Sequence, residues 1–189
     1  MKKNNKGFTL IELLAVIVIL GVLMIVAIPA MTRYIENSKR DVFVDMAKKY
    51  IASARYTLIS EGFKDSTGQI ISADDLVGRN GGPSKPKIVI PANLIKLENG
   101  TNKSPWGKTF KENEWGFVAV KYDESTGKFV YSFMGVDQGG NGITSLTDEN
   151  DLTRSKVQKK SGTTSFPAQQ AYSAFNNDIL IDGVVGVDS

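Results

Sequence analysis

An uncharged apolar run at residues 13–31 constrains this chain more than any other feature. It contains 19 residues, which as an α-helix extend for about 28 Å, close to the hydrocarbon thickness of a bilayer. Glu12 stands directly before the run, and Lys2, Lys3 and Lys6 precede it. A charged side chain in hydrocarbon costs roughly 2.5–3.5 kcal/mol at a helix centre and less near an end. We therefore expect Glu12 to have a partner or a role.

The residues around Glu12 form a dense motif, Lys-Gly-Phe-Thr-Leu-Ile-Glu at residues 6–12, with the apolar run behind it. This motif resembles the class III signal of type IV prepilins and pseudopilins. The resemblance implies that a prepilin peptidase cuts between Gly7 and Phe8 on the cytoplasmic side and methylates the new amine of Phe8. It also implies that Glu12 pairs with the Phe8 amine of a neighbouring subunit during assembly. Phe8 and Glu12 are one helical turn apart, so each chain end carries a cation and an anion at similar depth.

A basic start followed by an apolar run also fits a secretory signal peptide or an ordinary signal anchor. A signal peptide has an apolar region of about 7–15 residues followed by a small-x-small cleavage site. The run here is longer, and residues 27–33 contain no clean site of that kind. We therefore prefer the prepilin interpretation. Positive charge before the run places the N-terminus in the cytoplasm and everything after Met31 outside.

Two residues inside the apolar run disfavour a regular helix. Gly21 weakens a helix by roughly 1 kcal/mol relative to alanine. Pro29 lacks an N–H and clashes with the carbonyl of Ile25, so we expect a kink between Ile25 and Pro29. The resemblance implies a local melting zone from Gly21 to Pro29 in an assembled filament. The alternative is that glycine and proline are simply common in membrane helices.

The helical pattern continues beyond Pro29 and changes character. Apolar residues recur there at the spacing of an amphipathic helix, namely at Phe43, Ala47, Tyr50, Ile51, Ala54 and Leu58. Gly62 is suited to end this helix as a C-cap. One helix from about Phe8 to Glu61 would be roughly 80 Å long, apolar all round in its first half and on one face in its second. A membrane anchor joined to a separate soluble helix is the alternative, because Pro29 can break the rod.

Alternating apolar residues predict a β-hairpin in the second half of the chain. Residues 115–122 and 128–136 form its two strands, and residues 123–127 form its loop. We expect its apolar face to pack on the second half of the long helix. Residues 104–108 predict a turn with an aromatic plug, and residues 179–181 can supply one more strand.

The segment between the long helix and the hairpin gives weaker signals. Residues 63–86 are loop-like, and Ser72 could cap a short helix. Residues 88–97 are ambiguous between strand and helix, since Pro91 interrupts them.

Together these elements predict an α+β fold, a long N-terminal helix packed on a small antiparallel β-sheet, which is the pilin fold that the resemblance implies. The expected organisation has four parts. Residues 1–7 form a leader peptide, and residues 8–31 form the transmembrane or filament-core half of the helix. Residues 32–62 form its amphipathic half, and residues 63–189 form a globular head.

Composition excludes several classes of function. The chain has 23 basic and 20 acidic residues, and cleavage after Gly7 removes three lysines and no acid. No positive field for nucleic acid then remains, and no specific nucleic acid is predicted as a partner. The chain has no cysteine and no histidine, which excludes disulfides and removes the usual zinc ligands and the commonest general base. We therefore predict that the protein is not an enzyme.

An acidic, glycine-rich stretch at residues 137–151 predicts a loop. It begins with glycines around Asn141 and continues with Asp148, Glu149 and Asp151. Carboxylates suit calcium, and some pseudopilins, which the chain resembles, bind calcium in a C-terminal loop. Because the ligand spacing of an EF-hand is absent, a solvated acidic loop is favoured and no cofactor is predicted.

The resemblance implies a structural subunit of a type IV pilus. Such a subunit is stored in the cytoplasmic membrane as a single-pass protein with its N-terminus inside. Separate assembly machinery then polymerises it into a helical filament of identical subunits on the cell surface. The alternatives are a pseudopilin of a type II secretion or DNA-uptake system, and a minor or tip adhesive pilin.

Overall fold

The computed structural model describes residues 7–64, 68–77, 88–92, 95, 103–109, 116–159 and 179–180. The chain divides into two compact units, residues 1–38 and residues 39–189. The domain boundaries expected after residues 7, 31 and 62 remain predictions.

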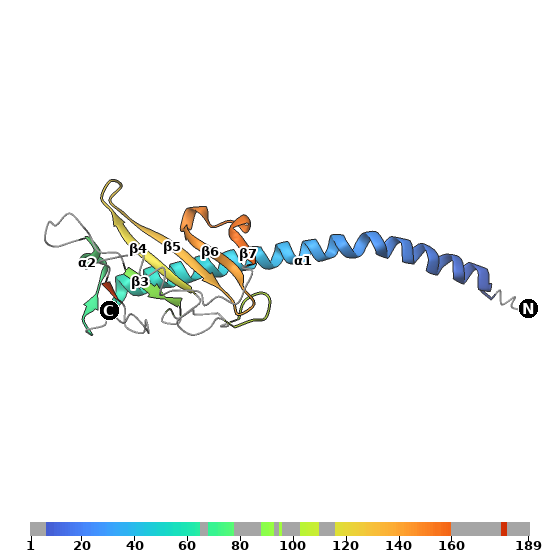
Figure 1. Ribbon diagram of the computed structural model, residues 1–189, viewed down its shortest axis with the longest axis horizontal. Coiled ribbons are helices and arrows are strands. Elements are labelled where there is room, and N and C mark those ends of the chain that lie inside the picture. Colours follow the sequence, from blue (N-terminus) through green and yellow to red (C-terminus); the bar gives the residue numbers. More distant parts are fainter. Residues whose placement is uncertain are drawn as a thin grey trace, which may run out of the picture. The chain divides into compact units, whose positions relative to one another are not determined.

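Helix α1, Leu10–Ser60, is continuous and contains Pro29 in its interior (Figure 1). The predicted single helix is therefore confirmed over the alternative of two separate helices. Gly62 follows its last turn with φ of 71°, the left-handed conformation that favours glycine at a helix end. The kink at Ile25–Pro29 and the melting zone from Gly21 remain predictions.

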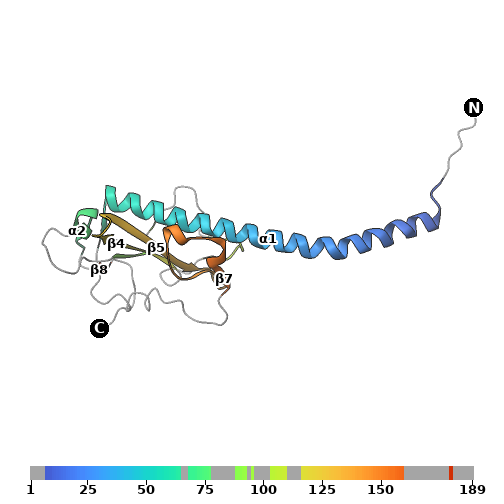
Figure 2. The same cartoon turned by 90° about the horizontal axis from the view of Figure 1, so that it is seen from above.

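The second half of α1 has one buried face. The six residues predicted from the helical spacing are all buried, which confirms that prediction, and Val44 joins them. Tyr50 stacks on Phe133 of the sheet with 5.9 Å between ring centroids. Phe43 is 1% exposed and packs against Trp106, also with 5.9 Å between centroids. The buried face of α1 thus forms the main core together with strand residues, and Figure 2 shows the second half of α1 running along the sheet.

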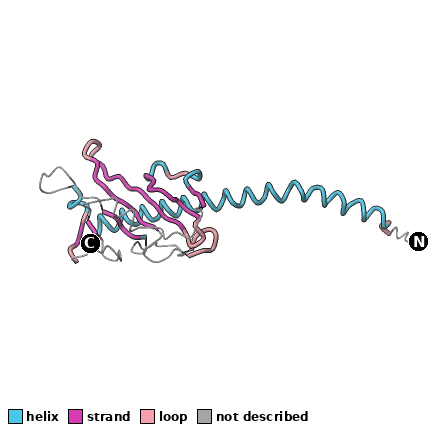
Figure 3. Tube along the Cα trace, in the orientation of Figure 1, coloured by secondary structure: helices cyan, strands magenta, loops and turns pink. Residues whose placement is uncertain are grey.

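The main sheet has six strands in the order β7-β6-β5-β4-β3-β8. The strands are drawn in magenta in Figure 3. The strands are β3 Ile88–Pro91, β4 Gly116–Asp123, β5 Lys128–Val136, β6 Asn141–Asp148, β7 Val157–Lys159 and β8 Ile179–Leu180. All neighbouring pairs are antiparallel except β3 with β8, which is parallel. The predicted hairpin is confirmed, since β4 and β5 pair from Gly116↔Gly135 to Asp123↔Lys128.

The predicted loop at residues 137–151 is wrong in its middle part, where Asn141–Asp148 forms β6 between β5 and β7. Gly142 has a packing reason to be glycine within this strand. A Cβ on Gly142 would lie 2.2 Å from the carbonyl oxygen of Gly135 and 2.9 Å from Cζ of Phe43. The glycine that suggested a loop therefore allows β6 to approach β5 and α1 closely.

The remaining short elements lie outside the six-stranded sheet. Strands β1, Phe63–Lys64, and β2, Ile70–Ile71, form a two-stranded sheet in the segment that was expected to be loop. Helix α2, Ala73–Val77, confirms the short helix expected after Ser72. The 3₁₀ helices η2, Glu149–Asp151, and η3, Arg154–Lys156, follow β6.

Two ion pairs tie these 3₁₀ helices to α1. Arg154 donates through Nε to Oδ1 of Asp41 at 2.7 Å and through Nη2 to Oδ2. These hydrogen bonds hold the pKa of Asp41 below its usual value. Arg55 pairs with Glu149, and its guanidinium lies 4.5 Å from the ring centroid of Tyr131. Two separate ion pairs therefore hold the segment after β6 against the helix.

Candidate processing and assembly site

The start of α1 is built as a capping box by Thr9 and Glu12. The backbone N–H of Glu12 donates to Oγ1 of Thr9 at 3.3 Å. In return, the backbone N–H and the hydroxyl of Thr9 both donate to Oε2 of Glu12 at 2.8 Å. Reciprocal bonds of this kind satisfy N–H groups that a helix start leaves without partners. Sequence analysis missed this role of Glu12, although the Thr-x-x-Glu spacing signals it.

Gly7 and Phe8 lie outside the helix, directly before the capping box. Phe8 is 83% exposed, and apart from the residues next to it in the chain, no described atom lies within 4 Å of a Cβ placed on Gly7. The peptide bond between the two residues is therefore open to a protein that binds this segment. Gly7, Phe8 and Glu12 thus lie close together along the chain at the start of α1, and their roles in processing and assembly remain predictions.

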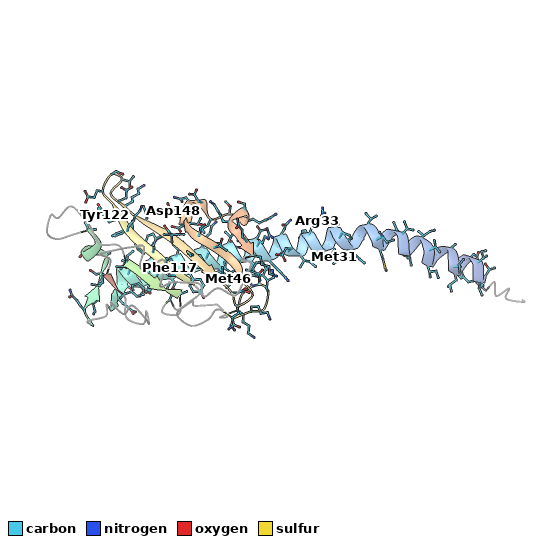
Figure 4. The ribbon with its side chains drawn as sticks, viewed as in Figure 1. Met31, Arg33, Met46, Phe117, Tyr122 and Asp148 are labelled. Atoms are coloured by element: carbon cyan, nitrogen blue, oxygen red, sulfur yellow. The ribbon has the colours of Figure 1, made fainter. Side chains whose placement is uncertain are left out.

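The apolar part of α1 has no cover within the described chain. Every residue from 7 to 35 is exposed, including Leu10 at 84% and Ile25 at 73%. Figure 4 shows side chains standing out all around this stretch, with Met31 and Arg33 labelled near its end. Among the described residues, one helix, Leu10–Ser60, is long and apolar enough to cross a membrane. Exposed apolar surface of this extent is typical of segments that contact lipid or other proteins. Gly21 and Pro29 both lie within it.

Three of the four acidic residues in the segment 137–151, namely Asp137, Asp148 and Glu149, are engaged by donors of the protein. Asp137 is fully buried and accepts hydrogen bonds from Ser104 Oγ and from the backbone N–H groups of Gly139 and Asn141. Asp148 accepts one from Ser132, while Glu149 is the ion-pair partner of Arg55 described above. Within the described ranges, no group of three or more acidic residues is placed to hold a metal ion.

Asp137 also fixes the predicted turn at residues 104–108. The N–H of Gly107 donates to the carbonyl oxygen of Ser104 at 2.8 Å, which closes the turn. The Ser104–Asp137 hydrogen bond joins this turn to the end of β5. The turn then presents Trp106 to Phe43, so the predicted aromatic plug is confirmed.

Comparison with known proteins points to the same N-terminal segment. The model of the family described as "Prokaryotic N-terminal methylation motif" matches residues 2–28. A fimbrial protein of Dichelobacter nodosus is 36% identical over 90 residues, which are 48% of this chain and 53% of that protein. A type IV major fimbrial protein FimA of the same organism is 31% identical over 128 residues, or 68% of this chain and 73% of that protein. A second FimA is 37% identical over 104 residues, or 55% of this chain and 59% of that protein.

The chain thus spans between about half and three quarters of the length of these relatives. No solved structure shows a significant match. The methylation motif, the extended similarity to FimA and the long apolar helix packed on an antiparallel sheet agree with one another. This chain therefore belongs to the type IV pilin family.

Proposed function

We propose that this protein is a structural subunit of a type IV pilus and has no catalytic role. The observation that carries the proposal is the exposed, mostly apolar segment at residues 7–35. In a filament, the same segments of other subunits would cover it. Before assembly, it would span the cytoplasmic membrane with the N-terminus inside, in the orientation that the three leading lysines favour.

Processing precedes assembly in this proposal. A prepilin peptidase cleaves between Gly7 and Phe8 and methylates the amine of Phe8. The exposure of both residues and the match to the methylation motif support this step. The mature chain then begins with a cation one helical turn before Glu12.

Glu12 guides assembly by pairing with the Phe8 amine of a neighbouring subunit. The physical reason is that both charges lie at the edge of an apolar segment, where each is costly without a partner. The other partners are the assembly machinery in the cytoplasmic membrane and further copies of this chain. The description of two relatives as major fimbrial proteins favours a pilus over a pseudopilus.

Filaments sheared from cells test processing directly through their intact mass and N-terminal residue. We expect a chain that begins at Phe8 and carries one added methyl group. Filaments made of chains that begin at Met1 would contradict processing.

The assembly role is tested by Glu12→Ala, which we expect to be cleaved normally but retained in the membrane. The matched control is Thr9→Val, which removes the hydroxyl of the capping box and keeps the carboxylate. Filament yield should be lost in the first variant and retained in the second. Normal yield from Glu12→Ala would refute the role, and equal loss in both variants would assign the effect to the helix cap.

A further inference from the structure

Lysines from two distant parts of the chain gather at one end of the main sheet. Lys103 pairs with Thr109, the residue after Lys108, whereas Lys156 belongs to η3 and Lys159 to β7. All of their side chains are exposed. We call these four lysines the basic rim: Lys103, Lys108, Lys156 and Lys159.

The turn between β5 and β6 joins the two halves of the basic rim. The stem of Lys108 passes along this turn, because its Cγ lies 3.5 Å from a Cβ placed on Gly139. Two residues further on, Asn141 is the cross-strand partner of Lys159. Lysines that are far apart in sequence therefore lie beside the same few residues of backbone.

The basic rim lies beside the first turns of α1 within the second compact unit, residues 39–189. Arg154, two residues before Lys156, is paired with Asp41. Trp106, between Lys103 and Lys108 in sequence, packs against Phe43. Figure 1 shows β7 at the end of the sheet where this part of α1 lies. The rim thus marks the end of the unit at which the chain enters it.

The positive charge of the basic rim is available to a partner. Within the described chain, none of the four lysines takes part in an ion pair. Two acids at this end do not offset them, because Asp41 is already paired with Arg154 and Asp137 is buried among protein donors. Exposed ammonium groups in such a cluster suit phosphate oxygens.

This end of the unit is tied closely to the apolar run. The run ends at Met31, and the second unit begins eight residues later at Lys39. Eight residues reach at most about 29 Å even when fully extended. This bound follows from chain length alone, so it holds at any angle between the two units.

We propose that the basic rim binds the phosphate headgroups of anionic phospholipids in the membrane that the apolar segment spans. This inference rests on the proposed function, since it concerns the subunit stored in the membrane before assembly. Anionic lipid attracts basic residues within about one Debye length of its surface, about 8 Å at physiological salt. The short tether keeps headgroups within reach of every stored subunit, which favours lipid over nucleic acid as the source of phosphate.

Fluorescence of Trp106 in vesicles tests this contact. The full chain carries Trp115→Phe, so that Trp106 is its remaining tryptophan. It is reconstituted with a headgroup-labelled quencher lipid, either in phosphatidylcholine or in an equal mixture of phosphatidylcholine and phosphatidylglycerol. We expect stronger quenching in the mixture, and we expect salt of about 1 M to remove the increase, because the Debye length is then about 3 Å.

Paired substitutions assign the effect to the basic rim. Each lysine near an anionic surface strengthens association about fivefold. Lys108→Gln combined with Lys159→Gln should therefore lower the ratio of surface-bound to free heads by up to about 25-fold and remove the increase in quenching. Lys121→Gln combined with Lys128→Gln is the matched control, because these exposed lysines lie at the hairpin-loop end of β4 and β5. The control should keep the increase, and both double variants should melt like the wild type.

Three results would overturn the proposal. These are an unchanged increase in the Lys108–Lys159 variant, an equal loss in both double variants, and binding of a short DNA duplex by the rim in place of phosphatidylglycerol. Each of them leaves the proposed function intact if the wild type still forms filaments. Absence of filaments from the wild type would refute the proposed function itself.

Discussion

Truncation of Phe43 to alanine should strongly destabilise the fold, because this residue joins three parts of the structure. It lies on α1, it packs against Trp106 of the turn at residues 104–108, and its ring fills the space beside Gly142 of β6. Only 1% of its surface is exposed. Replacement by alanine therefore removes buried surface and leaves a cavity at the junction of helix, turn and strand.

The size of the effect follows from these contacts. Burial of a phenylalanine side chain contributes about 1.5–3 kcal/mol, and the cavity raises the cost of truncation to about 3–5 kcal/mol. For a domain of this size, that loss lowers the melting temperature by about 6–20 °C. Val42→Ala is the matched control, because Val42 is the preceding residue and is 47% exposed. It should change the stability by no more than about 0.5 kcal/mol.

The assay is thermal unfolding of the full chain in detergent, followed by near-ultraviolet circular dichroism. Phe43→Leu keeps most of the apolar volume and should lie between the wild type and Phe43→Ala. Equal melting temperatures for Phe43→Ala and Val42→Ala would refute the reasoning, because they would show that this junction does not hold the core together.

Three further predictions concern the same part of the molecule. Gly142→Ala should lower the melting temperature by several degrees. The new Cβ would lie 2.2 Å from the carbonyl oxygen of Gly135, and the backbone at Gly142 has φ of 156°. An unchanged melting temperature would contradict the close approach of the two strands. Arg154 lowers the pKa of Asp41 in the folded protein. The pair therefore stabilises the fold at pH values above the pKa of Asp41 in the unfolded chain, about 4. This contribution is lost as the pH falls through the lower pKa that Asp41 has in the folded protein. On acidification from neutral pH to below about pH 4, Asp41→Asn should therefore lose less stability in melting curves than the wild type, and parallel losses would count against the pair. Calcium or a chelator should leave the melting curve unchanged, because Asp137, Asp148 and Glu149 of the acidic segment already have protein donors; a rise with calcium would reveal a site.

The helix and the hairpin could be predicted from sequence because their patterns are local. The buried face of α1 repeats with the period of a helix, so the positions of Phe43 and Leu58 followed from spacing alone. Strands β4 and β5 alternate with a period of two and are joined by a short loop, so their pairing needed no distant information. Elements of this kind are specified by neighbours along the chain.

Strand β6 and the buried Asp137 could not be predicted because distant partners define them. The segment Asn141–Asp148 is mostly polar and begins next to glycines, which is typical of a loop, and it becomes a strand by pairing with β5 and β7. Asp137 was expected in a solvated acidic segment. The structure buries it because Ser104 and backbone N–H groups supply its hydrogen bonds, and backbone donors leave no trace in the sequence. The capping box, by contrast, was visible as Thr9 and Glu12 and was overlooked.

The capping box has a consequence for the assembly role proposed for Glu12. Both hydrogen bonds from Thr9 end on the same carboxylate oxygen, Oε2. In the proposed assembly, the second oxygen, Oε1, would accept the Phe8 amine of an incoming subunit. One oxygen of the carboxylate would then complete the chain's own helix while the other binds the neighbour. A subunit of this kind would join a filament without breaking the cap of the helix by which it joins.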